Sequence, residues 1–141
     1  MFEEVIYEVS DPTENYGEKD LLYKEEVYEI IGRCFEVHNE LGPGFSEAVY
    51  KEAMAVEFAE KSIPFEREKP FDILYKGKKL SRKYICDFII DDSIIIEVKA
   101  QATLIEANSA QLLNYLAASK CRLGLLINFG EKSLKFKRYI L

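Results

Sequence analysis

A chain of 141 residues with 48% hydrophobic and 31% charged residues has the size and balance of one folded domain, which excludes a disordered protein. We expect neither a bilayer-spanning run nor a secretory signal, and the three scattered cysteines, Cys34, Cys86 and Cys121, favour a reduced, cytoplasmic protein with no membrane partner and no zinc site. The formal net charge of −6 would argue against a nucleic-acid partner if it were evenly spread.

The first part of the chain predicts an acidic leader followed by two helices. Residues 1–22 show no sustained period, and we expect them to be extended or partly ordered ahead of a single domain over 23–141. Residues 24–41 repeat apolar side chains at helical spacing, and the Gly-Pro-Gly at 42–44 predicts the end of that helix. A second helix is predicted over 45–61.

The period changes after residue 64, where β-branched and aromatic residues become frequent. Three strands joined by short turns are predicted there, followed by one helix and two more strands. We expect the strands on either side of this helix to be parallel and joined by a right-handed crossover, in a mixed α/β sheet covered by helices on both faces. The predicted strands cover 65–76, 79–90, 93–99, 121–129 and 133–140, and the helix covers 104–119.

The charge is unevenly distributed along these elements. Residues 1–26 hold nine acidic and two basic side chains, whereas the rest of the chain holds 16 acidic and 17 basic ones. Bases concentrate in residues 76–83 and 132–138, where they either protect edge strands from aggregation or contact nucleic-acid phosphates. The candidate nucleic-acid-binding residues are Lys76, Lys78, Lys79, Arg82, Lys83, Lys135, Lys137 and Arg138.

The stretch IIIEVK at 94–99 ends an apolar strand with two charges. Because side chains alternate between the faces of a strand, Glu97 and Lys99 share one face with Ile95. The other apolar residues of the stretch lie on the opposite face. The two charges therefore point in the same direction.

The preceding strand brings a second carboxylate to this face if the turn has the right length. With a turn at residues 91–93, Ile90 pairs with Ile94 and Asp87 stands opposite Glu97, with Cβ atoms about 4.5–5.5 Å apart. A two-residue turn would instead put the two carboxylates on opposite faces.

Two facing carboxylates repel each other unless a positive charge lies near them. A divalent cation is one candidate, because Mg²⁺ commonly takes one or two carboxylates and keeps several waters. A neighbouring lysine can then orient a water or stabilise charge on a phosphate. The alternative is that the strand simply ends here and its charges form an exposed ion pair.

These residues also form a recognisable pattern. Asp87 followed across a hairpin by Glu97-Val98-Lys99 resembles the D…(D/E)xK signature of the PD-(D/E)XK nuclease superfamily, with Cys86 in place of the proline. The resemblance runs from about residue 25 to 141. It implies a restriction-endonuclease-like fold with the core order α-β-β-β-α-β, preceded by an extra N-terminal helix.

Two further motifs add to this resemblance. Gln111 and Tyr115 are similar to the QxxxY motif of the RecB-type branch, and their spacing places both on one helix face. The segment GFSEAVY at 44–50 resembles the motif that names the GxxExxY protein family.

The resemblance implies a role for each of these positions. Asp87 and Glu97 would bind Mg²⁺ or Mn²⁺, helped by the Val98 carbonyl and by Glu47. Lys99 would act on the attacking water or the scissile phosphate. The last two catalytic positions, Gln111 and Tyr115, would contact the DNA backbone or brace the lysine.

The leading functional hypothesis is therefore a metal-dependent nuclease that hydrolyses DNA phosphodiester bonds. RNA as the substrate is a second reading that these motifs leave open. A third is a nuclease fold used as a non-catalytic nucleic-acid or protein interaction module. A homodimer or a larger assembly fits a chain of this size.

Overall fold

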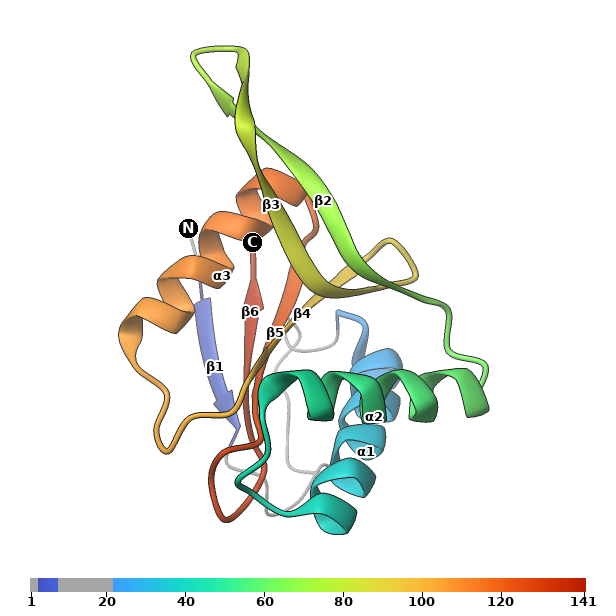
Figure 1. The fold of residues 1–141 in the computed structure, drawn as a ribbon. Helices are drawn as coiled ribbons and strands as arrows, with labels where there is room; N and C mark the ends of the chain where they lie inside the picture. The colour runs from blue at the N-terminus through green and yellow to red at the C-terminus, as the bar shows by residue number, and fades with distance from the viewer. Residues whose placement is uncertain (1–2, 8–21) are drawn as a thin grey trace.

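The computed structural model describes residues 3–7 and 22–141 (Figure 1). The predicted order of two helices, three strands, a helix and two strands is confirmed, with each boundary within two residues of the expected position. The leader was predicted as extended or partly ordered, and most of it, residues 8–21, lies outside the described residues. The elements are β1 (Glu3–Tyr7), α1 (Lys24–Leu41), α2 (Glu47–Glu60), β2 (Phe65–Tyr75), β3 (Lys78–Ile90), β4 (Ile94–Lys99), α3 (Glu106–Ser119), β5 (Leu123–Asn128) and β6 (Lys135–Ile140).

The strands form one mixed sheet in the order β1-β6-β5-β4-β3-β2. β4 and β5 are parallel and connected through α3, as expected, and all other neighbours are antiparallel. The sequence did not predict β1, which pairs with β6 along its whole length. β6 consequently lies between β1 and β5, so the interpretation of its lysines as guards of an edge strand is wrong.

Helices cover both faces of the sheet, α1 and α2 on one side and α3 on the other (Figure 1). The alternation predicted for β4 is confirmed, because Ile94, Ile96 and Val98 pack against α1 and α2 while Ile95 packs against α3. Each of these side chains is at most 1% exposed, and full burial of such a residue stabilises the fold by roughly 1.5–3 kcal/mol. The core therefore fixes which way Glu97 and Lys99 face.

The β2–β3 hairpin is longer than the rest of the sheet and projects from it (Figure 1). Its turn is only two residues long, since Tyr75 pairs with Lys78. Lys76 and Gly77 have φ angles of 50° and 76°, the left-handed values that a tight primed turn requires and that glycine adopts freely. None of the helices in the described part of the chain is long and apolar enough to cross a bilayer.

Candidate active site

The β3–β4 hairpin has the register that the sequence suggested. Ile90 pairs with Ile94, and the Ser93 N–H donates a hydrogen bond to the Ile90 carbonyl at 2.9 Å. Asp91 and Asp92 occupy the turn with positive φ angles, a conformation that aspartate tolerates better than most residues. The predicted three-residue turn is thus confirmed.

Beyond this register, the carboxylates themselves connect the two strands. The Val98 N–H donates to Asp87 Oδ2 at 2.7 Å, and the Asp87 N–H donates to Glu97 Oε1 at 3.4 Å. The backbone pairing of β3 with β4 ends at Phe88 and Ile96, so these side-chain bonds replace the next rung of the ladder. The two acids therefore lie side by side where the strands separate.

Glu97 is a buried acid, with 6% of its surface exposed. The Tyr84 hydroxyl donates to its Oε1 at 2.5 Å, and burial keeps Tyr84 protonated by raising its pKa. Burial, followed by the negative charge of Asp87, raises the pKa of Glu97 to about 8, against the opposing effect of its hydrogen bonds from Tyr84 and the Asp87 N–H. Without a neighbouring cation, this carboxyl therefore holds its proton at neutral pH.

A lysine that the sequence analysis missed neutralises the other acid. Lys51 of α2 places Nζ 3.2 Å from Asp87 Oδ1 and 3.3 Å from Glu68 Oε1. The side chains of Lys51 and Asp87 are only 17% and 15% exposed, so the pair is partly shielded from water. Its only sequence signal was helical spacing, because Lys51 lies one turn after Glu47.

Lys99 is the last residue of β4 and is half-buried, and strand alternation assigns it to the face of Ile95 and Glu97. Its backbone is held by β5, since Lys99 is in register with Asn128 and its carbonyl accepts a hydrogen bond from the Phe129 N–H. The buried Asn128 amide bonds both the N–H and the carbonyl of Gln101, each at 2.9 Å. Gly130 permits this contact, because a Cβ there would lie 2.4 Å from the Gln101 nitrogen.

The α3 residues of the predicted QxxxY pair lie on the Glu97 side of the sheet. Tyr115 stacks on Tyr84 with ring centroids 3.3 Å apart. Burial, then the charges of Glu97 and Asp87, raise the pKa of Tyr115, while a hydrogen bond with Gln111 lowers it. Gln111 itself is exposed and lies one helical turn before Tyr115 on α3.

The GxxExxY segment forms the junction between α1 and α2. Tyr50 is fully buried, and its hydroxyl donates to the Gly42 carbonyl at 2.5 Å and accepts from the Phe45 N–H at 3.2 Å. Its ring stacks on Phe129 at 4.6 Å. Tyr50 therefore shapes this loop and the start of α2, on which Glu47 lies half-buried.

The donor atoms present fit a hard cation in part. Asp87 and Glu97 supply adjacent carboxylate oxygens, which suit Mg²⁺ or Mn²⁺ when waters complete the coordination shell. Within residues 3–7 and 22–141, no three His, Cys, Asp or Glu side chains gather as a metal site would need, so Glu47 does not join the other two acids here. The Val98 N–H bonds to Asp87, which places that peptide group at the site.

The predicted nucleic-acid contacts fall into two groups. The five basic residues of the hairpin are all exposed, whereas Lys135 and Lys137 on β6 are half-buried. Arg138 was expected to contact nucleic acid, but it is 2% exposed and its guanidinium donates to the Leu22 carbonyl. This hydrogen bond joins β6 to the segment before α1.

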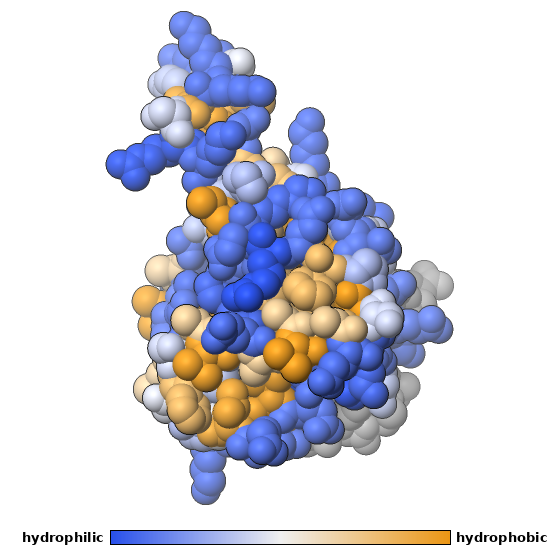
Figure 2. Space-filling view, turned by 45° about the vertical axis from the view of Figure 1, so that its right-hand side comes forward, coloured by the Kyte–Doolittle hydropathy of each residue, from blue (hydrophilic) through white to orange (hydrophobic). Residues whose placement is uncertain are grey.

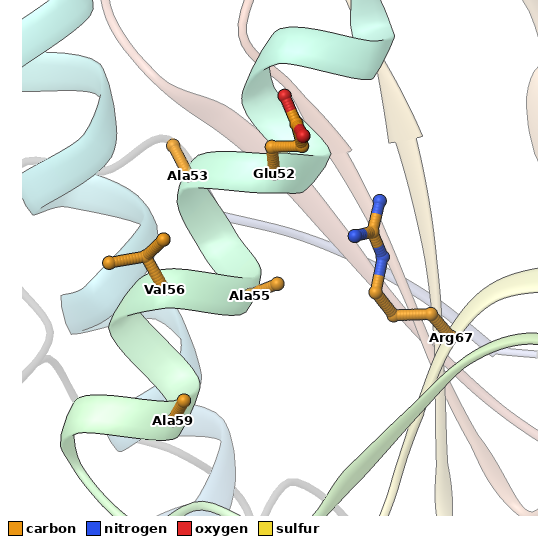
Figure 3. Close-up of a pocket in the computed structure, with 6 residues that line it drawn as sticks. All are labelled: Glu52, Ala53, Ala55, Val56, Ala59 and Arg67. Atoms are coloured by element: carbon orange, nitrogen blue, oxygen red, sulfur yellow. The ribbon is translucent and has the colours of Figure 1, made fainter.

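A separate surface hollow lies between α2 and β2 (Figure 3). It is lined by Glu52, small apolar residues of α2 and Arg67, whose side chain extends toward the helix. Its lining includes none of the candidate site residues Asp87, Glu97, Lys51 and Lys99. The catalytic chemistry is therefore not expected there.

Comparison with known proteins supports the same assignment of fold. A family model described as the PD-(D/E)XK nuclease superfamily matches residues 24–139. Among solved structures, the crystal structure of SSO0001 is similar with a TM-score of 0.52 and 22% sequence identity. The similarity covers 86% of this chain but 60% of SSO0001, so the chain spans well under the full length of that protein. No curated protein matches.

Proposed function

The chain belongs to the PD-(D/E)XK nuclease superfamily, and on that premise we propose that it hydrolyses DNA phosphodiester bonds with Mg²⁺ or Mn²⁺ at Asp87 and Glu97. The observation that supports this most strongly is the junction of β3 and β4, where Asp87 bonds the Val98 N–H and Glu97 bonds the Asp87 N–H. These hydrogen bonds hold the two carboxyl groups side by side. Once Glu97 has lost its proton, the pair would offer two adjacent carboxylates to a divalent cation.

A bound cation would polarise the scissile phosphate and lower the pKa of a water molecule. The protein's own residues supply the rest. The shared hydrogen bonds hold Asp87 and Glu97 in place, and Tyr84 orients the Glu97 carboxylate through its hydroxyl. Lys99, two residues after Glu97 on the same strand face, would position the attacking water or stabilise charge on the phosphate.

The remaining predicted residues have supporting roles in this proposal. Gln111 would contact the DNA backbone from α3, and Tyr115 would brace Tyr84 through their stacked rings. Glu47 would help to hold the metal or its water, and the Val98 carbonyl would add an oxygen ligand. The half-buried Lys135 and Lys137 would add to the positive potential near the DNA.

The finer assignments rest on sequence motifs. We also propose that the chain is of the GxxExxY type. The hydrogen bond from Tyr50 to the loop after α1 supports this. Three free, buried cysteines support a reducing, cytoplasmic location. A homodimer or larger assembly stays part of the proposal, because a chain of this size offers little surface to surround DNA.

The test is cleavage of double-stranded DNA, single-stranded DNA and RNA with Mg²⁺, with Mn²⁺ and with chelator. We expect metal-dependent DNA cleavage that Asp87→Asn and Lys99→Ala each reduce at least a hundredfold. Asp92→Asn is the matched control, because this turn acid is exposed and lies outside the site. Equal activity of the wild type, Asp87→Asn and Lys99→Ala would refute the assignment of these residues to the active site. Preferential cleavage of RNA would show that RNA, and not DNA, is the substrate.

The second candidate is a nuclease fold that binds nucleic acid or protein without cutting. One observation favours it: Lys51 already neutralises Asp87, in the position that a cation would need. Calorimetry with Mn²⁺ separates the two candidates. Saturable Mn²⁺ binding that Asp87→Asn abolishes supports the nuclease, whereas DNA binding with no Mn²⁺ binding and no cleavage supports the interaction module.

A further inference from the structure

The outer half of the β2–β3 hairpin, residues 72–83, projects from the body of the protein, and we refer to it as the arm (Figure 1). Ile73 at its base still packs against the core beside α3. Every residue of the arm from Leu74 to Lys83 is exposed. Figure 2 shows it as a mostly hydrophilic projection with some apolar atoms. A projection of this length buries little apolar surface, so folding alone gives no reason for it.

The arm is strongly basic in an acidic protein. It holds five basic residues and one acid, Asp72, which is a net charge of +4 against −6 for the whole chain. Lys79 and Lys83 share Asp72 at 3.3 and 3.5 Å. Lys78 and Arg82 have no ion-pair partner among the described residues. The arm therefore carries positive charge that the described part of the chain does not neutralise.

The apolar groups of the arm are exposed together with these charges. Leu74 and Tyr75 are 62% and 60% exposed, and Leu80 is 41% exposed. Lys76 lies over the Tyr75 ring, 5.4 Å from its centroid. Positive groups interleaved with aromatic and aliphatic side chains suit a polyanion with apolar edges, which describes the groove of a nucleic acid.

We propose that the arm lies as a two-stranded ribbon in a groove of duplex DNA, and that this duplex is the substrate of the Asp87–Glu97 site. Only the second part, that this duplex is the substrate, rests on the proposed function. The major groove of B-DNA is about 12 Å wide and admits a two-stranded β-ribbon. A single strand has no groove, so it would leave one face of the ribbon without contacts.

The arm and the site are parts of one strand, which fixes their spacing. Strand β3 continues from the arm through Asp87 to Ile90. A strand rises about 3.3 Å per residue, close to the 3.4 Å rise per base pair of DNA. Lys78 lies nine residues before Asp87, so the arm reaches about 30 Å, or roughly one turn of duplex, from the candidate site.

The test compares two triple variants of the full chain in buffer with chelator, so that binding is measured without cleavage. The arm variant is Lys76→Asn, Lys78→Gln and Arg82→Gln. The control is Lys61→Gln, Lys120→Asn and Arg122→Gln, which removes the same charge from exposed positions and includes a second lysine with positive φ, Lys120. Affinity for a 20-base-pair duplex, an 8-base-pair duplex and a 20-base single strand is measured by fluorescence anisotropy from 50 to 200 mM salt.

We expect the arm variant to bind the long duplex at least tenfold more weakly and with a salt slope smaller by about 2–3, because three phosphate contacts are lost. We expect less than a threefold change for the control and for the arm variant on the short duplex. Equal long-duplex affinity of both variants, or tighter binding of wild type to the single strand, would overturn the inference. Light scattering that finds the wild type dimeric and the arm variant monomeric would also overturn it, since the arm would then contact a second copy of the chain.

These outcomes are independent of catalysis. Arm-dependent duplex binding by a protein that never cleaves DNA would support the groove contact and refute the proposed function. Metal-dependent cleavage with no arm-dependent binding would support the proposed function and refute the groove contact. Circular dichroism of both variants confirms that the hairpin and the sheet remain folded.

Discussion

Lys51 and the Val98 N–H each bind one carboxylate oxygen of Asp87. The Lys51 Nζ lies 3.2 Å from Oδ1, and Oδ2 accepts a hydrogen bond from the Val98 N–H. The lysine therefore stands where a second positive charge would approach this acid. Glu68, 3.3 Å from the same Nζ, offers the lysine another partner when Asp87 is engaged elsewhere. The metal-free protein thus carries its own cation at the site.

Removing this lysine should strengthen metal binding. In Lys51→Met, Mn²⁺ no longer meets a like charge beside Asp87, and we expect its dissociation constant to fall about tenfold, or about 1.4 kcal/mol. Isothermal titration calorimetry measures this. Lys61→Met, at the exposed end of the same helix, is the control and should bind Mn²⁺ as the wild type does. Weaker binding in Lys51→Met would show instead that the lysine holds Asp87 in its binding position.

Metal binding should depend on pH through Glu97. Burial raises the pKa of Glu97 to about 8, so below that pH the cation must displace a proton. We expect Mn²⁺ affinity to rise from pH 6 to pH 9 and level off above. Calorimetry in buffers of different ionisation enthalpy should detect the released proton. An affinity that is flat over this range would contradict the prediction.

The same group should affect the stability of the metal-free protein in the opposite direction. The folded-state pKa of Glu97 is raised, so its contribution to stability is fully present below its ordinary value near 4.5 and is lost as the pH rises through about 8. We expect the stability difference between wild type and Glu97→Gln to become less favourable to the wild type from pH 5 to pH 8.5. Chemical denaturation at each pH measures that difference.

Tyr84 should tune the site without contacting the phosphate. Tyr84→Phe removes the hydroxyl that donates to Glu97, and this hydrogen bond lowers the pKa of the carboxyl. A hydrogen bond to a charged group is worth about 1.5–3 kcal/mol, so we expect roughly tenfold weaker Mn²⁺ binding at pH 7 and a pH profile displaced upward. Tyr28→Phe, on the exposed face of α1, is the matched control. An unchanged pH profile would show that Tyr84 does not affect metal binding through Glu97.

Tyr50 should act on folding. Tyr50→Phe keeps the ring that stacks on Phe129 but leaves the Gly42 carbonyl and the Phe45 N–H without their partner. We expect a loss of about 1–3 kcal/mol in the free energy of unfolding, measured with urea, and Mn²⁺ affinity within threefold of wild type. A loss of metal binding at unchanged stability would place Tyr50 in the site itself.

The sequence predicted most of the fold because local signals agreed with the tertiary structure. The alternation along IIIEVK and the three-residue turn before it were sufficient to place Asp87 beside Glu97. The pattern could not reveal that the backbone ladder stops at Phe88, since that depends on how far the two strands diverge. It therefore predicted the neighbours but not the hydrogen bonds that join them.

The residues that the sequence analysis missed come from distant elements. Lys51 reaches Asp87 from 36 positions earlier, and nothing in its helix period indicates that partner. Arg138 belongs to a basic cluster and was therefore expected at the surface, but β1 and the segment before α1 cover its strand. β1 was missed because its short acidic sequence has little strand signal of its own. Its strand conformation depends on pairing with β6.

Gly130 connects the end of β5 to the loop after Lys99, since the Gln101 backbone occupies the space of a side chain there. The Gln101 N–H and the Phe129 N–H donate across the same contact, to the Asn128 side chain and to the Lys99 carbonyl. Since both hydrogen bonds cross one contact, we expect the end of β5 and the loop after β4 to open together. The two amide protons should therefore exchange with solvent at nearly the same rate, and Gly130→Ala should accelerate both together.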